Sequence, residues 1–298
     1  DFSEVQNDIY NAANSEDLGV FQQSIGFNND LAFIVVDNAN SITIVDRYTF
    51  EKVGSITTGL ITPRYITFFN NKGYVTNWGD TASSTDDFIA IVNLEDYTVE
   101  STTIPVSEGP EQIVEKNGTL YVSHKGGFGS NNVVTLISGA DHTAQELEVG
   151  EKPDEMIFDT SGNLWVLSEG KTVYDSDFNI IEQTPGALVK INTTTNEIDT
   201  TISFTGVDQP SLMTYSDGTI YYYLNSKVYA MSETSMTLPE TAIAEGSFYG
   251  MEVNNNKLYA VDAKDFASEG TLKVYDLSNN QETNSLSVGI VPAKIYFN

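Results

Sequence analysis

The chain repeats one pattern of apolar and polar positions: an alternating run, a two-residue polar turn and a second alternating run. The clearest copy comprises residues 63–69, the turn Asn70-Asn71 and residues 72–76. Period-two alternation on both sides of two asparagines predicts a β-hairpin, because Asn tolerates the left-handed backbone of a tight turn. The pattern begins seven times, and each first strand holds an apolar residue at the same position: Ile25, Ile66, Ile113, Met156, Met213, Met251 and Ile295.

An aromatic residue marks the second strand of six copies, and these rings are expected to pack between neighbouring repeats. Their separation ranges from 38 residues (Tyr221 to Tyr259) to 56 (Trp165 to Tyr221), against the roughly 40–50 residues of a four-stranded propeller blade. Each hairpin is followed by a second one, and no segment shows a helical pattern. We therefore predict an all-β fold, a seven-bladed β-propeller of four-stranded antiparallel blades. The six rings are Phe33, Tyr74, Tyr121, Trp165, Tyr221 and Tyr259.

The seventh blade is predicted to contain both ends of a single domain spanning residues 1–298. Residues 292–297 would supply its inner strand and residues 3–9 its outermost strand, which would close the propeller and leave no open sheet edge. The two middle strands have no counterpart in the sequence. We expect roughly 20–30 further residues before Asp1 on the basis of blade length; the alternative is a three-stranded or gapped last blade.

Composition narrows the range of partners. The formal charge is −28, from 42 acidic and 14 basic residues, which argues against nucleic acid and favours cations or a basic protein surface. The chain has no cysteine, so disulfides and thiol catalysis are excluded. The longest apolar run, residues 31–36, is far shorter than the ~20 residues of a membrane-spanning helix.

Residues for common enzyme chemistry are scarce, and we predict a protein that is not an enzyme. Only two histidines, His124 and His142, are present, and no G-x-S-x-G motif or phosphate-binding glycine loop accompanies them. A hydrolase or lactonase that uses carboxylates and Ca²⁺ is the less favoured alternative. Asp80, Asp86 and Asp87 could bind Ca²⁺, although they do not have the spacing of an EF-hand.

Four long connections, residues 77–87, 124–132, 168–186 and 262–270, are expected on one face of the propeller. Extra loop length on one face of a rigid scaffold is typical of a binding site. Aromatic side chains on and beside these loops would form an apolar wall for a large flat ligand, unless they pack beneath their own loops. Arg64 would lie at the channel mouth, where it would contact the ligand or form a salt bridge with Glu111 or Glu155. The candidate ligand-binding residues are Arg64, Tyr65, Trp78, Gln112, Phe128, Glu155, Tyr174, Phe248, Tyr249 and Phe266.

Several stretches carry a resemblance to a known family. The repeat segments Ile44-Val45-Asp46 and Val274-Tyr275-Asp276-Leu277 resemble those of YncE-like propellers. Pro63-Arg64-Tyr65, Phe248-Tyr249-Gly250 and the ending Val288-Gly289-Ile290-Val291-Pro292 are similar to the surface lipoprotein branch of that family in gut and marine Gram-negative bacteria.

That branch includes cobalamin-capturing propellers of TonB-dependent uptake systems. The resemblance implies an exported, surface-exposed outer-membrane protein, held to the membrane only by a lipid anchor outside this sequence. It further implies a bulky, corrinoid-like ligand that is passed to a TonB-dependent transporter. The alternative from another class is a protein–protein interaction scaffold in an outer-membrane surface complex.

Overall fold

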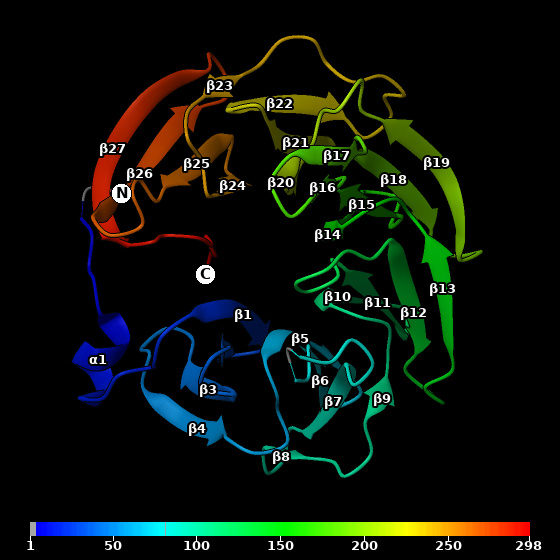
Figure 1. Ribbon diagram of the computed structural model, residues 1–298. Coiled ribbons are helices and arrows are strands. Elements are labelled where there is room, and N and C mark those ends of the chain that lie inside the picture. Colours follow the sequence, from blue (N-terminus) through cyan, green and yellow to red (C-terminus); the bar gives the residue numbers. More distant parts are fainter. Residues whose placement is uncertain (1–3, 81) are drawn as a thin grey trace. The chain divides into compact units, whose positions relative to one another are not determined.

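The computed structural model describes residues 4–80 and 82–298, which form two compact units (Figure 1). The N-terminal unit comprises residues 8–154 together with Asn298, and the C-terminal unit comprises residues 155–297 together with the described residues before Asp8. Each unit contains three blade-like sheets of antiparallel strands, and the C-terminal unit has a small two-stranded sheet besides. The described residues therefore form six blades, five of four strands and one in which the outermost strand is split into two pieces, and the strand order in each is that of a propeller blade.

In the N-terminal unit the first strands of neighbouring sheets contact each other, β1 with β5 and β5 with β10. The outermost strand of the second sheet is broken into two short pieces that both pair with β7. The strands are β1 (Gln22–Asn28), β2 (Leu31–Val36), β3 (Ser41–Asp46), β4 (Lys52–Ile56), β5 (Pro63–Phe69), β6 (Lys72–Asn77), β7 (Phe88–Asn93), β8 (Thr98–Val99), β9 (Ile104–Pro105), β10 (Pro110–Lys116), β11 (Thr119–His124), β12 (Val133–Ser138) and β13 (Ala144–Glu148).

The C-terminal unit repeats this arrangement, with an additional two-stranded sheet, β16–β17, inserted between β15 and β18. Its first strand, β14, begins two residues before the boundary between the units. The strands are β14 (Pro153–Phe158), β15 (Leu164–Ser168), β16 (Thr172–Tyr174), β17 (Ile180–Gln183), β18 (Ala187–Asn192), β19 (Glu197–Ser203), β20 (Ser211–Ser216), β21 (Thr219–Leu224), β22 (Lys227–Ser232), β23 (Ala244–Glu245), β24 (Gly250–Asn254), β25 (Lys257–Asp262), β26 (Glu269–Asp276) and β27 (Gln281–Ile290).

The turns that the sequence predicted are present. Phe69 pairs with Lys72, so Asn70 and Asn71 alone form the connection between β5 and β6. Both asparagines have positive φ, 49° and 59°, as a type I′ hairpin turn requires. The local sequence therefore specifies the register of this hairpin.

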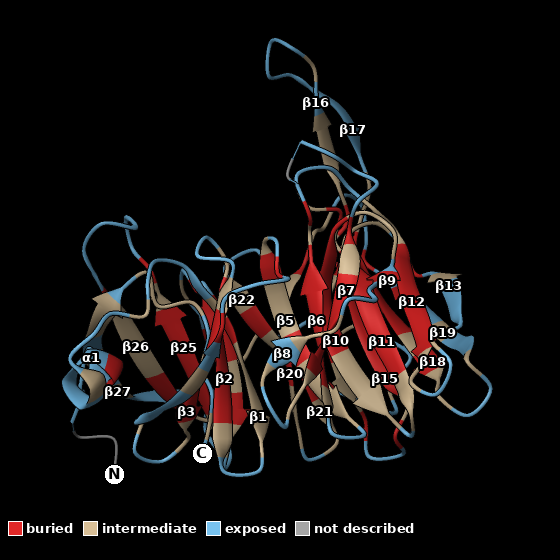
Figure 2. Ribbon diagram, turned by 90° about the horizontal axis from the view of Figure 1, so that it is seen from below, coloured by how far each residue is buried: buried red, intermediate tan, exposed pale blue. Residues whose placement is uncertain are grey.

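The second strand of each sheet is buried, and its aromatic ring packs as predicted. All six rings are at most 9% exposed, and Figure 2 shows that the buried positions gather in the central strands. Phe33 of the first sheet contacts Phe68 of the next, with ring centroids 4.9 Å apart. Trp165 lies in one core cluster with Met213 and Tyr222 of the following sheet. Apolar packing between successive sheets thus holds each unit together.

The prediction of seven blades is wrong, because the described residues form six blades and the two ends of the chain add no further one. Residues 292–297 form no strand, although Phe297 packs its ring on Tyr259 with centroids 5.0 Å apart. Of the expected partner strand, residue 3 lies outside the described residues and residues 4–8 are not a strand. A strand needs a neighbour for its backbone hydrogen bonds, and neither segment belongs to a sheet of the described residues.

The expectation of no helix is also wrong, since α1 (Ile9–Asn14) forms a short helix. Its Tyr10 is buried and its hydroxyl donates a hydrogen bond to Glu16. The side chain of Asn14 donates to the Phe50 carbonyl oxygen (2.8 Å) and accepts from the Lys52 amide (2.8 Å). These contacts fix α1 to the turn between β3 and β4. Across residues 4–80 and 82–298, no helix has the length and apolar character needed to span a membrane.

Candidate functional site

Three predicted site residues meet at one rim of the N-terminal unit. Trp78, in the loop after β6, donates from Nε1 to the Pro110 carbonyl oxygen at 3.0 Å. The Arg64 guanidinium lies over the Trp78 ring, 4.0 Å from its centroid. Phe128, in the loop after β11, meets Trp78 edge-on with centroids 5.8 Å apart. Phe128 is 80% exposed, so this cluster places an aromatic surface in solvent on a rigid base.

Arg64 joins all three sheets of the N-terminal unit by ion pairs. Its Nε and Nη2 donate to the two carboxylate oxygens of Glu111 at 3.0 and 2.9 Å, and Nη1 donates to Asp37 at 2.5 Å. Gln23 adds a hydrogen bond to Glu111 at 3.1 Å. Burial raises the pKa of Glu111, and the nearby guanidinium opposes that shift. The salt bridge to Glu111 was one of the two roles considered for Arg64, and the geometry shows it.

A small pocket of about 30 Å³ lies beside the aromatic pair. Asp87 lines it and is 3% exposed, and its carboxylate accepts a hydrogen bond from the Gly109 amide at 2.5 Å. Burial raises the pKa of Asp87 to about 6, and the negative charges of Asp86 and Glu108 add to the effect. The pocket is lined by Trp78, Ser83, Asp87, Glu108, Gly109, Gly127 and Phe128.

Close backbone contact shapes this pocket. Gly109 has a φ of 67°, and a Cβ there would lie 2.1 Å from the Gly127 amide nitrogen. Only glycine fits, because any side chain would clash with backbone that cannot move aside. The loop that contains Gly109 and the loop that contains Gly127 are therefore in close contact beside the pocket, where the Gly109 amide also donates to Asp87.

The aspartates considered for Ca²⁺ are used in loop structure. The Asp86 carboxylate accepts from the Asp80 amide at 2.9 Å, while Asp87 is bonded to Gly109. Among residues 4–80 and 82–298, no group of three or more acidic or histidine side chains is arranged to hold a metal ion.

A second aromatic pair lies on the C-terminal unit. Tyr249 and Phe266 are 46% and 55% exposed and meet edge-on, with centroids 5.1 Å apart. They line a cavity of about 130 Å³ together with Asp262 and Lys264. Phe248, which was expected on the same wall, also lines this cavity, but it is only 6% exposed and its ring packs on Tyr275 in the core.

The remaining predicted residues are distributed elsewhere. Tyr65 is half-buried against the core cluster around Tyr74, and Gln112 is buried, with its backbone N–H donating to the Ser123 hydroxyl at 3.1 Å. Glu155 forms an ion pair with Lys294 at 3.1 Å. Tyr174 is 55% exposed on β16.

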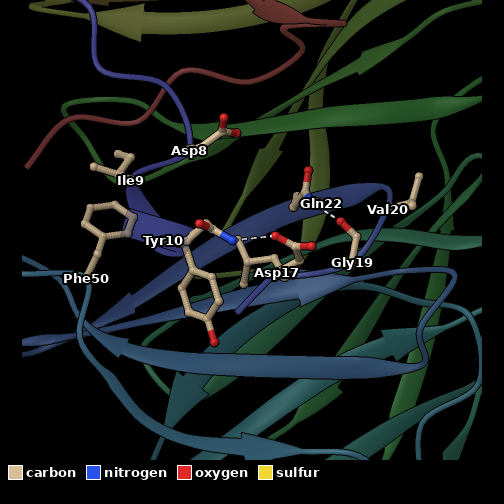
Figure 3. A pocket seen from close by; sticks show the side chains of 10 residues that line it. Asp8, Ile9, Tyr10, Asp17, Gly19, Val20, Gln22 and Phe50 are labelled. Atoms are coloured by element: carbon tan, nitrogen blue, oxygen red, sulfur yellow. Dashed lines mark hydrogen bonds between the residues drawn. The ribbon is translucent and has the colours of Figure 1, made fainter. Parts of the chain in front are cut away.

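Sequence reasoning missed three features. The connection 168–186 contains the β16–β17 hairpin, which projects from its sheet (Figure 2). Asp87 was considered only as a cation ligand, although its place directly before the apolar run 88–92 was a signal of burial. The third is a cavity of about 490 Å³ between α1 and the first sheet, whose walls include Tyr10, Val20 and Phe50 (Figure 3). It was not predicted, because residues 3–9 were expected to form a strand and no element was predicted between that strand and the first hairpin.

The two histidines have structural surroundings. His124 is fully buried, with Nε2 2.8 Å from the Thr135 hydroxyl and Nδ1 3.3 Å from the Glu108 carbonyl oxygen. Burial lowers the pKa of His124 to about 4, so it is neutral at pH 7. His142 packs edge-on against Tyr74. Neither contact set is that of a general base beside a nucleophile.

Comparison with known proteins identifies the fold. No family model matches the chain, and no curated protein matches it in sequence. Virginiamycin B lyase from Staphylococcus aureus superposes with a TM-score of 0.65 at 15% identity, covering 92% of this chain and 87% of that one. The extracellular domain of the one-component system BT4673 from B. thetaiotaomicron gives 0.64 at 14% identity, over 88% of this chain and 34% of that one. Apo AztD from Citrobacter koseri gives 0.56 at 11% identity, over 91% and 73%.

These similarities show a β-propeller, here with six four-stranded blades. At such low identity they show the fold alone, and the proteins that share it range from lyases to an extracellular domain. Function therefore has to be argued from the residues of this chain.

Proposed function

We propose that this protein is a non-catalytic cell-surface propeller that captures a bulky nutrient, such as a corrinoid, for a TonB-dependent outer-membrane transporter. The observation that carries the proposal is a pair of aromatic contacts, Trp78–Phe128 and Tyr249–Phe266, in which Phe128, Tyr249 and Phe266 are solvent-exposed and Trp78 is half-buried. Exposed aromatic rings lose apolar contact with water when a ligand covers them, and rigid loops reduce the entropy cost of binding.

Two further features support a binding role. The rings are held by the scaffold, since Trp78 is fixed by Arg64 on one face and by the Pro110 carbonyl oxygen at its edge. His124 is engaged in structural contacts. The surface location, the ligand class and the transporter come from the resemblance of the repeat segments to the surface lipoprotein propellers.

Titration calorimetry with cobalamin and with ferric siderophores tests the proposal. We expect one of these ligands to bind with nanomolar-class affinity. Replacing the ring pair that contacts it by alanine should weaken this affinity at least about tenfold. The variants are W78A/F128A and Y249A/F266A. Tyr48, 65% exposed on the short turn between β3 and β4, provides the matched control Y48A. No heat with either ligand class, or an equal loss in the control, would contradict the proposal.

One observation favours the alternative, a protein–protein interaction scaffold. The β16–β17 hairpin exposes four large apolar side chains at 53% to 86% of their area: Tyr174, Phe178, Ile180 and Ile181. Exposed apolar clusters of this kind mark interaction sites. Residues 168–186 contain four acidic residues and one lysine, so a partner with an apolar groove and a basic rim would be complementary.

We expect the double substitution F178S/I181S to abolish co-purification of a partner from native membranes. The free energy of unfolding should change by less than about 0.5 kcal/mol, because these side chains make few contacts in the folded chain. I198S is the matched control, since Ile198 is an isoleucine 40% exposed on the edge strand β19. Retained co-purification in F178S/I181S would rule out the hairpin as the docking element.

A further inference from the structure

The Asp87 pocket contains a buried carboxylate with one unpaired oxygen and negatively charged neighbours. Its Oδ1 has no hydrogen-bond partner among the described residues, while the other carboxylate oxygen is bonded to Gly109. The charged groups that act on Asp87 are Asp86 and Glu108, and both are negative. Leaving a buried acceptor unpaired is unfavourable, and more so when it is charged. A bound donor with positive charge would remove that cost.

We propose that this pocket binds the ammonium group of an organic amine, with the rest of the ligand lying on Phe128. The inference goes beyond the proposed function, because it concerns one functional group and holds whether or not the nutrient is a corrinoid.

The size and lining of the pocket select this group. A volume of about 30 Å³ matches one water-sized group. The walls offer oxygen acceptors from Asp87, Glu108 and Ser83, and an ammonium group has three donors. A calcium ion would need six to eight oxygen ligands, and no acidic cluster of that kind is present among the described residues.

The aromatic pair adds attraction for a cation. Trp78 and Phe128 both line the pocket and their rings are 5.8 Å apart, and the electron-rich face of an aromatic ring attracts a cation. The exposed ring of Phe128 extends outward from the pocket, so an amine with an apolar body can contact it. The site therefore selects ligands for a positive charge at its base, and its open end accepts apolar groups of different shapes.

Calorimetry at pH 7.5 with 2-phenylethylammonium, methylammonium and 2-phenylethanol tests the proposal. We expect 2-phenylethylammonium to bind at least about tenfold more tightly than the uncharged alcohol, and D87N to remove this preference. D86N, which removes a neighbouring charge that lies outside the pocket lining, should change affinity by less than about threefold. Equal binding of amine and alcohol, or unchanged binding to D87N, would overturn the proposal.

F128A keeps the proposal testable if D87N does not fold, since a side chain 80% exposed contributes little to stability. This substitution should weaken the binding of 2-phenylethylammonium at least about threefold and leave the binding of methylammonium unchanged. Unchanged affinity for both amines would contradict the proposal. Titrations of the same variants with cobalamin and siderophores test the proposed function separately, so the proposed function and the amine site can fail independently.

Discussion

Replacing Arg64 with methionine is expected to destabilise the N-terminal unit by about 3–5 kcal/mol, because it leaves a buried carboxylate without its partner. The Glu111 side chain is only 5% exposed and receives two of the three ion-pair hydrogen bonds of the guanidinium. Asp37, at 22% exposed, would lose the third. Methionine fills a similar volume, so the loss reports on charge and hydrogen bonding and not on a cavity.

Urea denaturation at pH 7, followed by tryptophan fluorescence, measures the effect. R64K should be intermediate, since lysine keeps the charge but cannot form the two parallel hydrogen bonds to Glu111. R64M/E111L should recover most of the loss, because replacing a buried ion pair by apolar residues is often neutral. A loss below about 1 kcal/mol in R64M would show that the ion pairs carry little of the stability, and no recovery in the double variant would show that the loss does not come from the unpaired Glu111 carboxylate.

The sequence was sufficient to predict the repeated unit. Asn70-Asn71 and its equivalents fix both the turn and the register of each hairpin, and the alternation places Phe33, Tyr74 and the corresponding rings in the core. These are properties of residues close together in the chain, or of positions that repeat. Local rules therefore predicted the repeated hairpins of the six blades, although not the structure at the two ends of the chain.

The number of blades depended on pairing between distant segments. Residues 292–297 have the apolar pattern of a first strand, yet they form none, because strand formation requires a partner with free backbone groups. Pattern alone cannot supply that partner. The β16–β17 hairpin was missed for a different reason. Its strands are short and therefore give a weak pattern, although Val173-Tyr174 and Ile180-Ile181 flank its turn.

The candidate site was predictable in part for a similar reason. Aromatic rings on long loops, such as the half-buried Trp78 and the exposed Phe128, could be recognised from loop length. Phe248 could not be separated from its neighbour Tyr249, since a one-residue step decides which of two adjacent side chains enters the core. The role of Asp87 depends on Gly109, which lies in another loop.

The carboxylate of Asp87 is also expected to govern how stability depends on pH. Its pKa is about 6 in the folded protein, against 3.8 as the ordinary value. Between these values the folded state retains a proton that the unfolded state has released, so this group favours folding most at low pH. Its contribution declines as pH rises through 6, and the total loss is about 3 kcal/mol for a difference of about two pKa units.

Comparing thermal unfolding of wild type and D87N from pH 4 to 8 isolates this contribution. The wild type should lose stability relative to D87N as pH rises from 4 to above 6, since asparagine has no proton to release. D86N is the matched control of opposite sign: the hydrogen bond from the Asp80 amide lowers the pKa of Asp86, so its charged form favours folding above pH 4. A parallel pH dependence in wild type and D87N would show that Asp87 is not the titrating group. If the pocket binds an amine, 2-phenylethylammonium should restore the lost stability above pH 6 and have little effect below pH 5, because only the ionised carboxylate attracts the cation.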